Sequence, residues 1–409
     1  MTEDRLDWRT KGAWQPGAGV PFAEFAAGRT GLFDGAFTWP VMVLRATAVE
    51  HNLAALAGFC RRHGFDFAPH GKTTMSPSLF QAQLEAGAWA ITVATANQVL
   101  ACRSFGLPRV LLANELLDST ALRWIGGEIA RGFDFLCFVD SVAGVQAIAR
   151  AMEQVPGGRS MQVFAEWGFA GGRAGCRTVD QLAEVAAAAD AAPRVELVGV
   201  AGYEGGLPGP GAAAAYLTAL RESVVELSRR GLLPPHVIVS AGGSTYFDVV
   251  AEALGGDWLP GHEVRTVLRS GAYLSHDHGF YHDRTPFLRV PEEGSLSPAL
   301  EIWAQVGSTP EPGLVIAGLG KRDAPIDEGM PVPLRHRTAD GVTHELRGWR
   351  VAKLNDHHAY VEVPPEARVS PGDLICFGIS HPCTAFDKWR VIPVVAEDYT
   401  VTDLLRTYF

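Results

Sequence analysis

The stretch Phe65-Asp66-Phe67-Ala68-Pro69-His70-Gly71-Lys72-Thr73-Thr74 decides the fold, because a short apolar run ends there in a turn that carries a lysine. An apolar run of this length, bounded by Pro and Gly, is typical of a β-strand. An open sheet of the Rossmann type would place a Gly-rich turn directly after its first strand. Gly71-Lys72-Thr73-Thr74 is not such a turn, so the stretch favours another α/β architecture.

Further apolar runs follow this stretch, and Ala-rich segments with a helical period separate them. The predicted strands after Phe65–His70 are Ile91–Thr95, Val110–Asn114, Phe135–Val139, Met161–Glu166, Leu197–Gly202, Val237–Ser240 and Val264–Leu268. The predicted helices include Pro77–Ala86, Ala96–Phe105, Val142–Met152, Val179–Ala189 and Ala212–Arg230. Strands that alternate with helices indicate βαβ units and a parallel sheet. The sequence therefore predicts an α/β fold, a (β/α)₈ TIM-type barrel over residues 47–290, with an open sheet as the alternative.

The pattern changes after about residue 295, where short apolar runs are split by Gly, Pro and Asp turns. These runs are Leu300–Val306, Gly313–Gly318, Leu346–Leu354, Tyr360–Val363, Asp373–Gly378 and Trp389–Val395. Short runs without long helical segments between them predict a mainly antiparallel β domain. The earlier run Val41–Ala46 is expected to add a strand to it. We therefore expect a second domain made of residues 1–46 and 291–409.

Composition excludes several classes of protein. The formal charge of −10 over 409 residues leaves no basic footprint for nucleic acid. No run of about 18 apolar residues occurs, and the charged start has no signal-type core, so we expect no membrane span and a cytoplasmic location. The cysteines are scattered, which favours reduced thiols in the core. A small-molecule ligand is the expected partner.

Lys72 stands where a barrel enzyme would place a reactive group. Active sites of these barrels lie at the carboxyl ends of the strands. A lysine just after the first strand, desolvated and beside positive charge, would have a lowered pKa and suit Schiff-base chemistry. On position alone, a solvated loop lysine remains the alternative.

Two glycine turns follow the seventh and eighth predicted strands, where barrels commonly bind phosphate. The first turn offers Gly242, Gly243, Ser244 and Thr245, and the second offers Arg269, Gly271 and Tyr273. Glycines let the backbone approach an anion, and the hydroxyls can donate hydrogen bonds. The first turn by itself could be an ordinary turn with an N-cap, but the pair predicts a phosphate cradle.

Arg173 and Tyr203 follow the fifth and sixth predicted strands, at the same end of the barrel. Arg173 could hold a phenolate or a carboxylate through charge-assisted hydrogen bonds, and a surface arginine is the alternative. Tyr203, next to Glu204, could pack against a ring or serve the structure only.

His381 and Cys383 lie two residues apart near the C-terminus, so in an extended segment they share one face. Imidazole and thiolate together suit zinc, and two protein ligands leave positions open for water or substrate. A buried cysteine beside an unrelated histidine is the alternative. The nearby Asp356-His357-His358 is a further candidate for this region, or a hairpin surface.

Taken together and in order, these motifs resemble the fold-type III pyridoxal-phosphate (PLP) enzymes. Within these enzymes, the chain is most similar to the D-serine dehydratase and D-threonine aldolase group, which shares the alanine racemase barrel. The motifs that carry the resemblance are the Pro69–Thr73 turn, Arg173, Gly202-Tyr203-Glu204-Gly205, the Gly242–Thr245 loop, Arg269-Ser270-Gly271 and His381-Pro382-Cys383. The resemblance implies PLP on Lys72 and a divalent metal on His381 and Cys383, with zinc ahead of manganese or magnesium. It also implies a homodimer and a small D-amino acid substrate.

The resemblance also implies a reaction. Zinc-dependent dehydratases of this group carry a His-x-Cys pair, whereas the aldolase form has a carboxylate in place of Cys383. We therefore expect a D-serine or D-threonine dehydratase that yields a 2-oxo acid and ammonia. A D-threonine aldolase is the first alternative, and a racemase or a non-catalytic PLP carrier is a further one. Thr74-Met75 departs from the His-Lys that many members have after the Lys-Thr pair.

Overall fold

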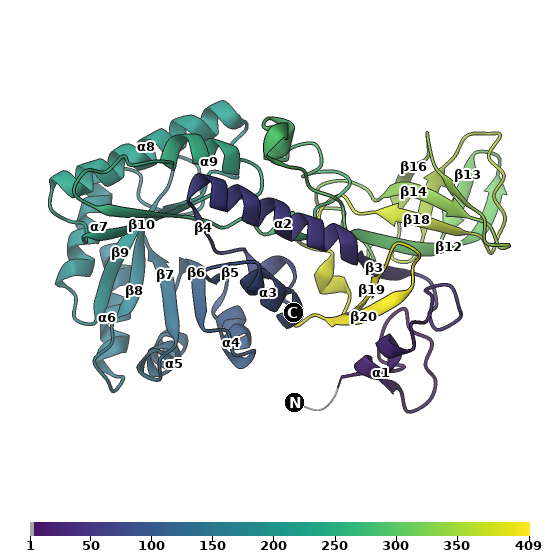
Figure 1. Ribbon diagram of the computed structural model, residues 1–409, viewed down its shortest axis with the longest axis horizontal. Helices are drawn as coiled ribbons and strands as arrows, with labels where there is room; N and C mark the ends of the chain where they lie inside the picture. Colours follow the sequence, from purple (N-terminus) through teal and green to yellow (C-terminus); the bar gives the residue numbers. More distant parts are fainter. Residues whose placement is uncertain (1–3) are drawn as a thin grey trace.

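The computed structural model describes residues 4–409, so residues 1–3 of the predicted second domain lie outside the described part. A barrel and a β-rich part lie end to end, and the barrel occupies the left side of Figure 1. Helix α2 (Ala46–His63) begins directly after β3 (Val41–Arg45) in the β-rich part and runs along the molecule towards the barrel. It ends at Gly64, which adopts a positive φ of 65° that an L side chain rarely tolerates.

Eight parallel strands form the barrel, in the order β4-β11-β10-β9-β8-β7-β6-β5. Their bounds are β4 (Asp66–Phe67), β5 (Ile91–Val93), β6 (Arg109–Glu115), β7 (Asp134–Val139), β8 (Met161–Trp167), β9 (Val195–Gly202), β10 (His236–Ala241) and β11 (Glu263–Leu268). The two end strands meet through a parallel bridge between His70 and Thr92, where the Thr92 N–H donates to the Pro69 carbonyl at 2.9 Å. The ring is therefore closed, and the predicted TIM-type barrel is confirmed over the open sheet.

Hydrophobic side chains fill both faces of these strands. Leu111, Leu136, Phe138 and Phe164 form a buried cluster on the inner face, and Val110 and its equivalents pack outward against the helices. Burial on both faces explains why the strands read as continuous apolar runs in the sequence.

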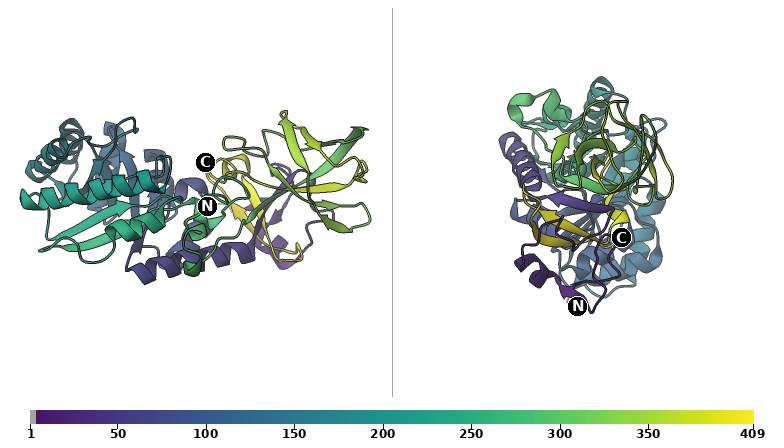
Figure 2. Two further views of the ribbon diagram at one scale, coloured as in Figure 1. Left: turned by 90° about the horizontal axis from the view of Figure 1, so that it is seen from above. Right: turned by 90° about the vertical axis from the view of Figure 1, so that its right-hand side faces the viewer.

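The helices that follow the strands cover the outside of the barrel, as the view from above in Figure 2 shows. They are α3 (Pro77–Glu85), α4 (Ala96–Ser104), α5 (Ser119–Ala130), α6 (Val142–Glu153), α7 (Val179–Ala191), α8 (Pro210–Arg229) and α9 (Phe247–Leu254). Thr95, Asp118, Ser141 and Thr178 cap the N-termini of α4 to α7 with side-chain oxygens. The helices α5 and α9 were not predicted, because α5 contains Gly126-Gly127 and α9 is short.

The β-rich part contains a sheet with the order β15-β14-β18-β12-β13-β17-β16. The strands are β12 (Leu300–Glu311), β13 (Leu314–Ala317), β14 (Val332–Arg337), β15 (Thr343–Glu345), β16 (Arg350–Leu354), β17 (Ala359–Glu362), β18 (Leu374–Gly378), β19 (Val391–Val395) and β20 (Val401–Arg406). Strand β3 pairs antiparallel with β12 and parallel with β19, as expected for the Val41–Ala46 run. Strands β14, β15 and β20 were not predicted, because charged residues interrupt their apolar pattern.

The first described segment packs on the β-rich part. It contains β1 (Arg5–Leu6), β2 (Val20–Pro21) and α1 (Phe22–Ala27). Leu6 and Phe25 join a buried cluster that includes Trp303 of β12. None of the described helices has the length and apolar character that crossing a membrane requires.

Asn52 joins the barrel to the segment that leads into the β-rich part. This fully buried side chain on α2 donates from Nδ2 to the carbonyls of Leu274 (3.0 Å) and Ser297 (2.8 Å). Its Oδ1 accepts from the Ser297 N–H at 2.7 Å. A single amide therefore satisfies three backbone groups at the joint between the two parts.

Replacing Asn52 should loosen this joint. We expect Asn52→Ala to lower the free energy of unfolding by about 3 kcal/mol, because each buried group left unpaired costs about 1–3 kcal/mol. Urea denaturation measures the effect, and Glu50→Ala, exposed on the same helix, is the control and should change stability by less than about 0.5 kcal/mol. Equal losses in the two variants would contradict this role for Asn52.

Candidate functional site

A cavity lies at the carboxyl ends of the barrel strands, where the sequence places the candidate residues. It is lined by Lys72, Arg173, Tyr203, Gly242, Gly243, Ser244, Arg269, Gly271 and Cys383, all of which were predicted, and by five further residues that include His70 and Tyr281. Cys383 comes from the β-rich part, so both parts of the chain contribute to one cavity.

Lys72 sits in a short 3₁₀ turn, η1 (Gly71–Thr73), directly after the barrel closure. A Cβ on Gly71 would lie 2.7 Å from the Phe80 ring, so only glycine lets the turn pack this closely. On the far side, Met75 adopts a positive φ of 41°, and its carbonyl accepts from the Tyr408 N–H at 2.9 Å. The lysine is therefore presented by a turn that is fixed at both ends.

The charge state of Lys72 is shifted towards the neutral amine. Burial lowers its pKa, and the nearby Arg173 guanidinium lowers it further, while Cys383 acts in the opposite direction. The pKa of His70 is well below its usual value, because of burial and the positive charges of Lys72, Arg269 and Arg173. The His70 Nδ1 is buried without a hydrogen-bond partner, and the residue faces the cavity.

Two arginines supply positive charge to the site. The guanidinium of Arg173 lies over the Tyr203 ring, 4.8 Å from its centroid. Arg269 is 5% exposed and donates to the Ser240 hydroxyl and to the Gly202 carbonyl, both at 2.6 Å. Arg269 is thus locked at the floor of the site.

The glycine turn after β10 is held by Glu204, which is fully buried. Its carboxylate accepts from the N–H of Gly242 at 3.1 Å and from the N–H of Gly243 at 2.6 Å. The sequence predicted that these two N–H groups would donate hydrogen bonds to a phosphate. In the structure they donate to the Glu204 carboxylate instead. Ser244, the next residue of the turn, lines the cavity, so it can still donate a hydrogen bond to an anion there.

Glycines also keep the floor and walls of the cavity open. A Cβ on Gly271 would lie 2.5 Å from the His70 carbonyl oxygen, and one on Gly243 would lie 3.1 Å from the Tyr203 ring. PLP is anionic and planar, and the cavity fits both properties. The Lys72 amine, the two arginines and the unpartnered His70 nitrogen suit an anion, and the glycines leave room for a flat ring.

His381 and Cys383 lie on the segment between β18 and the 3₁₀ turn η5 (Phe386–Lys388). His381 Nδ1 donates to Asp327 Oδ2 at 2.6 Å. Burial disfavours the charged imidazole, but hydrogen bonds and charge from Cys383 and Asp327 outweigh it and raise the pKa of His381 to about 9. Nitrogen and sulfur donors in contact suit a borderline-soft divalent metal such as zinc.

The segment that carries Cys383 touches the turn that carries Lys72. Cys383 Sγ lies 3.6 Å from the Thr73 hydroxyl, and Thr73 follows Lys72 in the chain. The Tyr281 ring, which also lines the cavity, lies 5.6 Å from the His381 ring. Within residues 4–409, no three or more His, Cys, Asp or Glu side chains are grouped so that they could hold a metal ion together. A metal at His381 and Cys383 would therefore need further ligands from water or substrate.

Some predicted residues lie elsewhere. Tyr273 is 1% exposed, with its hydroxyl bonded to Gln83 Nε2 at 3.1 Å and its ring packed on Phe67, so it belongs to the core. Thr245 is buried outside the cavity, and its carbonyl accepts from Arg289. Asp356-His357-His358 is an exposed hairpin turn between β16 and β17, and Asp356 pairs with Arg322 there.

Sequence reasoning also missed residues that the site contains. His70 and Tyr281 line the cavity, and Asp327 contacts His381. Tyr281 belongs to the polar stretch Ser275–His282 that follows the last barrel strand, so the barrel rule could have identified it. Asp327 lies in a loop 54 residues before His381 and has no local signal.

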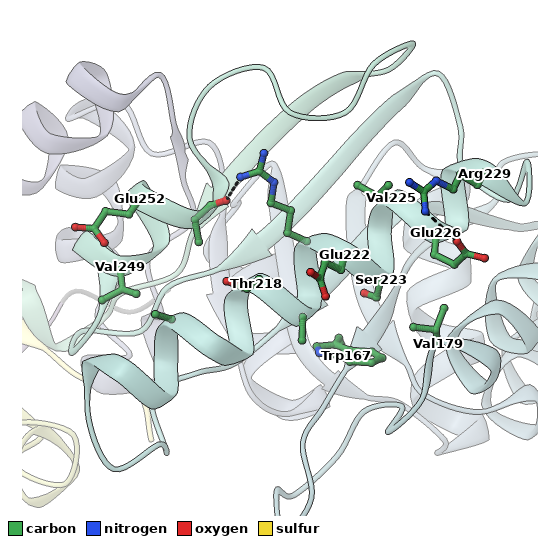
Figure 3. Close-up of a pocket in the computed structure, with 14 residues that line it drawn as sticks. Trp167, Val179, Thr218, Glu222, Ser223, Val225, Glu226, Arg229, Val249 and Glu252 are labelled. Atoms are coloured by element: carbon green, nitrogen blue, oxygen red, sulfur yellow. Dashed lines mark hydrogen bonds and ion pairs between the residues drawn. The ribbon is translucent and has the colours of Figure 1, made fainter.

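A larger hollow lies on the outside of the barrel, along α8 and α9 (Figure 3). Figure 3 shows Thr218, Glu222 and Glu226 on α8, and Val249 and Glu252 on α9. Glu226 is paired there with Arg229 at 3.6 Å. The hollow contains none of the candidate residues and lies along the outer helices rather than at the mouth formed by the carboxyl ends of the strands, so the barrel mouth is the better candidate site.

Family models match both parts of the chain. Residues 44–259 match the model of the alanine racemase N-terminal domain, which covers more than half of the chain. Residues 299–395 match the model of a putative serine dehydratase domain.

Similar known proteins include enzymes named as aldolases, dehydratases and alanine racemases. The 3-hydroxy-D-aspartate aldolase of Paracoccus denitrificans (strain Pd 1222) is 24% identical over 311 residues, 74% of this chain and 76% of the relative. The structure of D-threonine aldolase from Filomicrobium marinum has a TM-score of 0.77 and 22% identity, covering 91% of this chain and 95% of that one. D-threo-3-hydroxyaspartate dehydratase from Delftia sp. HT23 has a TM-score of 0.70 and 23% identity, covering 91% and 97%.

That dehydratase has also been solved as two variants. In one, a histidine is replaced by alanine, and in the other, which is metal-free, a cysteine two positions further along is replaced by alanine. At these identities, the structural likeness shows a shared fold.

Removing the Lys72 amine should abolish covalent attachment of the cofactor. We expect Lys72→Ala, reconstituted with PLP, to lack the visible absorption band of lysine-bound PLP, because no other lysine among residues 4–409 lines the cavity. Lys353→Ala, in the β-rich part, is the matched control and should keep the band. A band of wild-type intensity in Lys72→Ala would show that another lysine carries the cofactor.

Glu166 should make the stability of the protein depend on pH. Burial and the hydrogen-bonded neighbour Glu115 raise the pKa of this 5%-exposed carboxyl from 4.5 to about 9, against the opposing charges of Arg269 and Arg173. Between pH 4.5 and about 9, the Glu166 carboxyl is therefore protonated in the folded state and ionised in the unfolded state. Stability from this group falls as pH rises from about 4.5 and is lowest above about 9.

Glu166→Gln removes this titration while keeping an amide in place of the protonated carboxyl. We expect the thermal midpoint of the wild type to fall more steeply between pH 5 and 9 than that of the variant. The extra fall should correspond to a loss of at least about 1 kcal/mol in the free energy of unfolding. Thermal melts of the apoprotein measure the difference, and Glu196→Gln, exposed on the neighbouring strand β9, should follow the wild type. Parallel curves for Glu166→Gln and wild type would refute the shifted pKa.

Proposed function

The chain belongs to the family defined by the alanine racemase N-terminal domain, the fold-type III PLP enzymes, and on that premise we propose that it is a metal-assisted lyase of D-β-hydroxy amino acids. More specifically, we propose a dehydratase, which converts D-serine or D-threonine to a 2-oxo acid and ammonia. The observation that carries the proposal is the contact between the Thr73 hydroxyl and Cys383 Sγ at 3.6 Å, which brings the metal pair to the lysine turn.

The cofactor side of the reaction rests on Lys72. When bound there, PLP supplies an electron sink for the negative charge that develops at the substrate α-carbon. The lowered pKa of the Lys72 amine suits it to accept the α-proton, and its fixed turn lets it approach only one face of the substrate. Arg173, held over Tyr203, is positioned to bind an anionic oxygen of the cofactor or the substrate.

The metal side rests on His381 and Cys383. A divalent metal bound there would act as a Lewis acid on the substrate β-hydroxyl. Because Cys383 lines the same cavity as Lys72, a β-hydroxyl can face the metal pair while the α-proton faces the lysine. Loss of the α-proton and departure of the β-hydroxyl are the two events that β-elimination requires.

Elimination is favoured by the identity of the metal ligands. The D-threo-3-hydroxyaspartate dehydratase variant that lacks a cysteine two positions after a histidine has been solved in a metal-free form, and His381-x-Cys383 has the same spacing. Retro-aldol cleavage is the second candidate, because the Paracoccus and Filomicrobium relatives are aldolases. In that reaction the β-hydroxyl loses its proton and the Cα–Cβ bond breaks, using the same residues.

Product analysis with D-threonine separates the two reactions. We expect the PLP- and zinc-loaded enzyme to give 2-oxobutanoate and ammonia from D-threonine, and to leave L-threonine unreacted. Glycine and acetaldehyde as the main products would overturn the dehydratase and support the aldolase. No reaction with D-threonine, D-serine or D-3-hydroxyaspartate would overturn the lyase proposal.

Variants of the metal pair test the second half of the proposal. We expect His381→Ala and Cys383→Ala to lower kcat/KM by at least about 100-fold. Losing a residue that only hydrogen-bonds to a metal ligand already costs up to about 100-fold, and these two residues would bind the metal directly. His358→Ala, in the exposed hairpin turn, is the matched histidine control and should stay within about twofold of wild type. Wild-type activity in both site variants would contradict a metal-assisted reaction.

A further inference from the structure

Asp327 makes two contacts with the segment that carries the metal pair. Its Oδ2 accepts from His381 Nδ1 at 2.6 Å, and its Oδ1 accepts from the Thr384 hydroxyl at 3.0 Å. Both carboxylate oxygens therefore accept hydrogen bonds, one from a residue before Cys383 in the chain and one from the residue after it. A carboxylate held at both oxygens cannot rotate away from the imidazole without losing one of these bonds.

The loop around Asp327 is also tied down. The Ser380 hydroxyl donates to the Gly329 carbonyl at 2.6 Å, so residues adjacent to His381 and close to Asp327 are joined a second time. On the other side, Trp389 Nε1 donates to the Asp323 carbonyl at 2.9 Å, and Lys11 pairs with the Asp323 carboxylate at 3.1 Å. Asp327 thus sits on a loop whose position is fixed before any metal binds.

This geometry has a consequence for the ring of His381. Because Nδ1 donates its hydrogen to Asp327, the proton that the imidazole must lose to bind a metal is the one on Nε2, and the hydrogen bond sets the ring plane. Only Nε2 then remains to bind a metal. Histidines that ligate metals commonly donate their other nitrogen to a carboxylate, which orients the ring and raises its basicity.

We propose that Asp327 is a positioning residue, which holds His381 with Nε2 directed to the metal that it shares with Cys383. The inference rests on the proposed function, because it requires a metal at that pair. It goes beyond the proposed function by assigning part of the metal affinity to a side chain that binds neither metal nor substrate. Thr384 and Ser380 support Asp327 in this role.

The test measures metal affinity in the PLP-loaded enzyme, by zinc competition with a chromophoric chelator. We expect Asp327→Ala to bind zinc about 10–100-fold more weakly than wild type, as is usual for loss of an outer partner. We expect Thr384→Val, which frees only one carboxylate oxygen, to have a smaller loss. Glu328→Gln, which removes a charge from the exposed neighbouring residue, is the matched control and should stay within about twofold.

A spectroscopic readout separates positioning from a general loss of structure. With cobalt in place of zinc, the visible bands report the geometry of the histidine and thiolate ligands, and we expect them to shift in Asp327→Ala and not in Glu328→Gln. The absorption band of lysine-bound PLP should be unchanged in both variants, because Asp327 does not line the cavity.

The outcomes distinguish this inference from the function on which it rests. If wild type binds zinc and Asp327→Ala binds it equally well with the same cobalt spectrum, Asp327 has no positioning role and the proposed function stands. If wild-type holoenzyme binds neither zinc nor cobalt at His381 and Cys383, the metal half of the proposed function is wrong, and the inference is wrong with it.

Discussion

The site depends on one constraint, that the turn carrying Lys72 must meet the segment carrying Cys383. The Thr73 hydroxyl and Cys383 Sγ, 310 positions apart in the chain, lie 3.6 Å from each other. The turn can take part in this contact because the barrel bridge at His70 fixes it from below and Tyr408 fixes the backbone at Met75. If either part of the chain shifted, the amine and the metal pair would no longer share a cavity.

Most of the barrel could be predicted from the sequence, because strands buried on both faces appear as continuous apolar runs. The eight runs from Phe65 to Leu268 are all strands in the structure, with ends that differ by a few residues. The β-rich part was predicted less completely. Strand β14 contains Pro333 and several charged residues, and β15 is exposed on both faces, so neither has the apolar alternation that marks a half-buried strand.

The site was predictable where its residues follow strands, and not where contacts join distant loops. Lys72, Arg173 and Arg269 lie at the barrel mouth because the carboxyl ends of all eight strands converge there. The predicted use of the Gly242 and Gly243 N–H groups for a phosphate was wrong, because the sequence does not show that the Glu204 carboxylate already accepts from both. Asp327 has no motif, and only the folded loop brings it to His381.

The central claim is that Lys72 alone, among the five lysines of the chain, carries the cofactor. The most direct measurement is borohydride reduction of the PLP-loaded protein, followed by proteolysis and tandem mass spectrometry of the peptides. The account predicts a stoichiometric phosphopyridoxyl group on Lys72 and none on Lys11, Lys321, Lys353 or Lys388. Stoichiometric modification of any other lysine, with Lys72 unmodified, would contradict it.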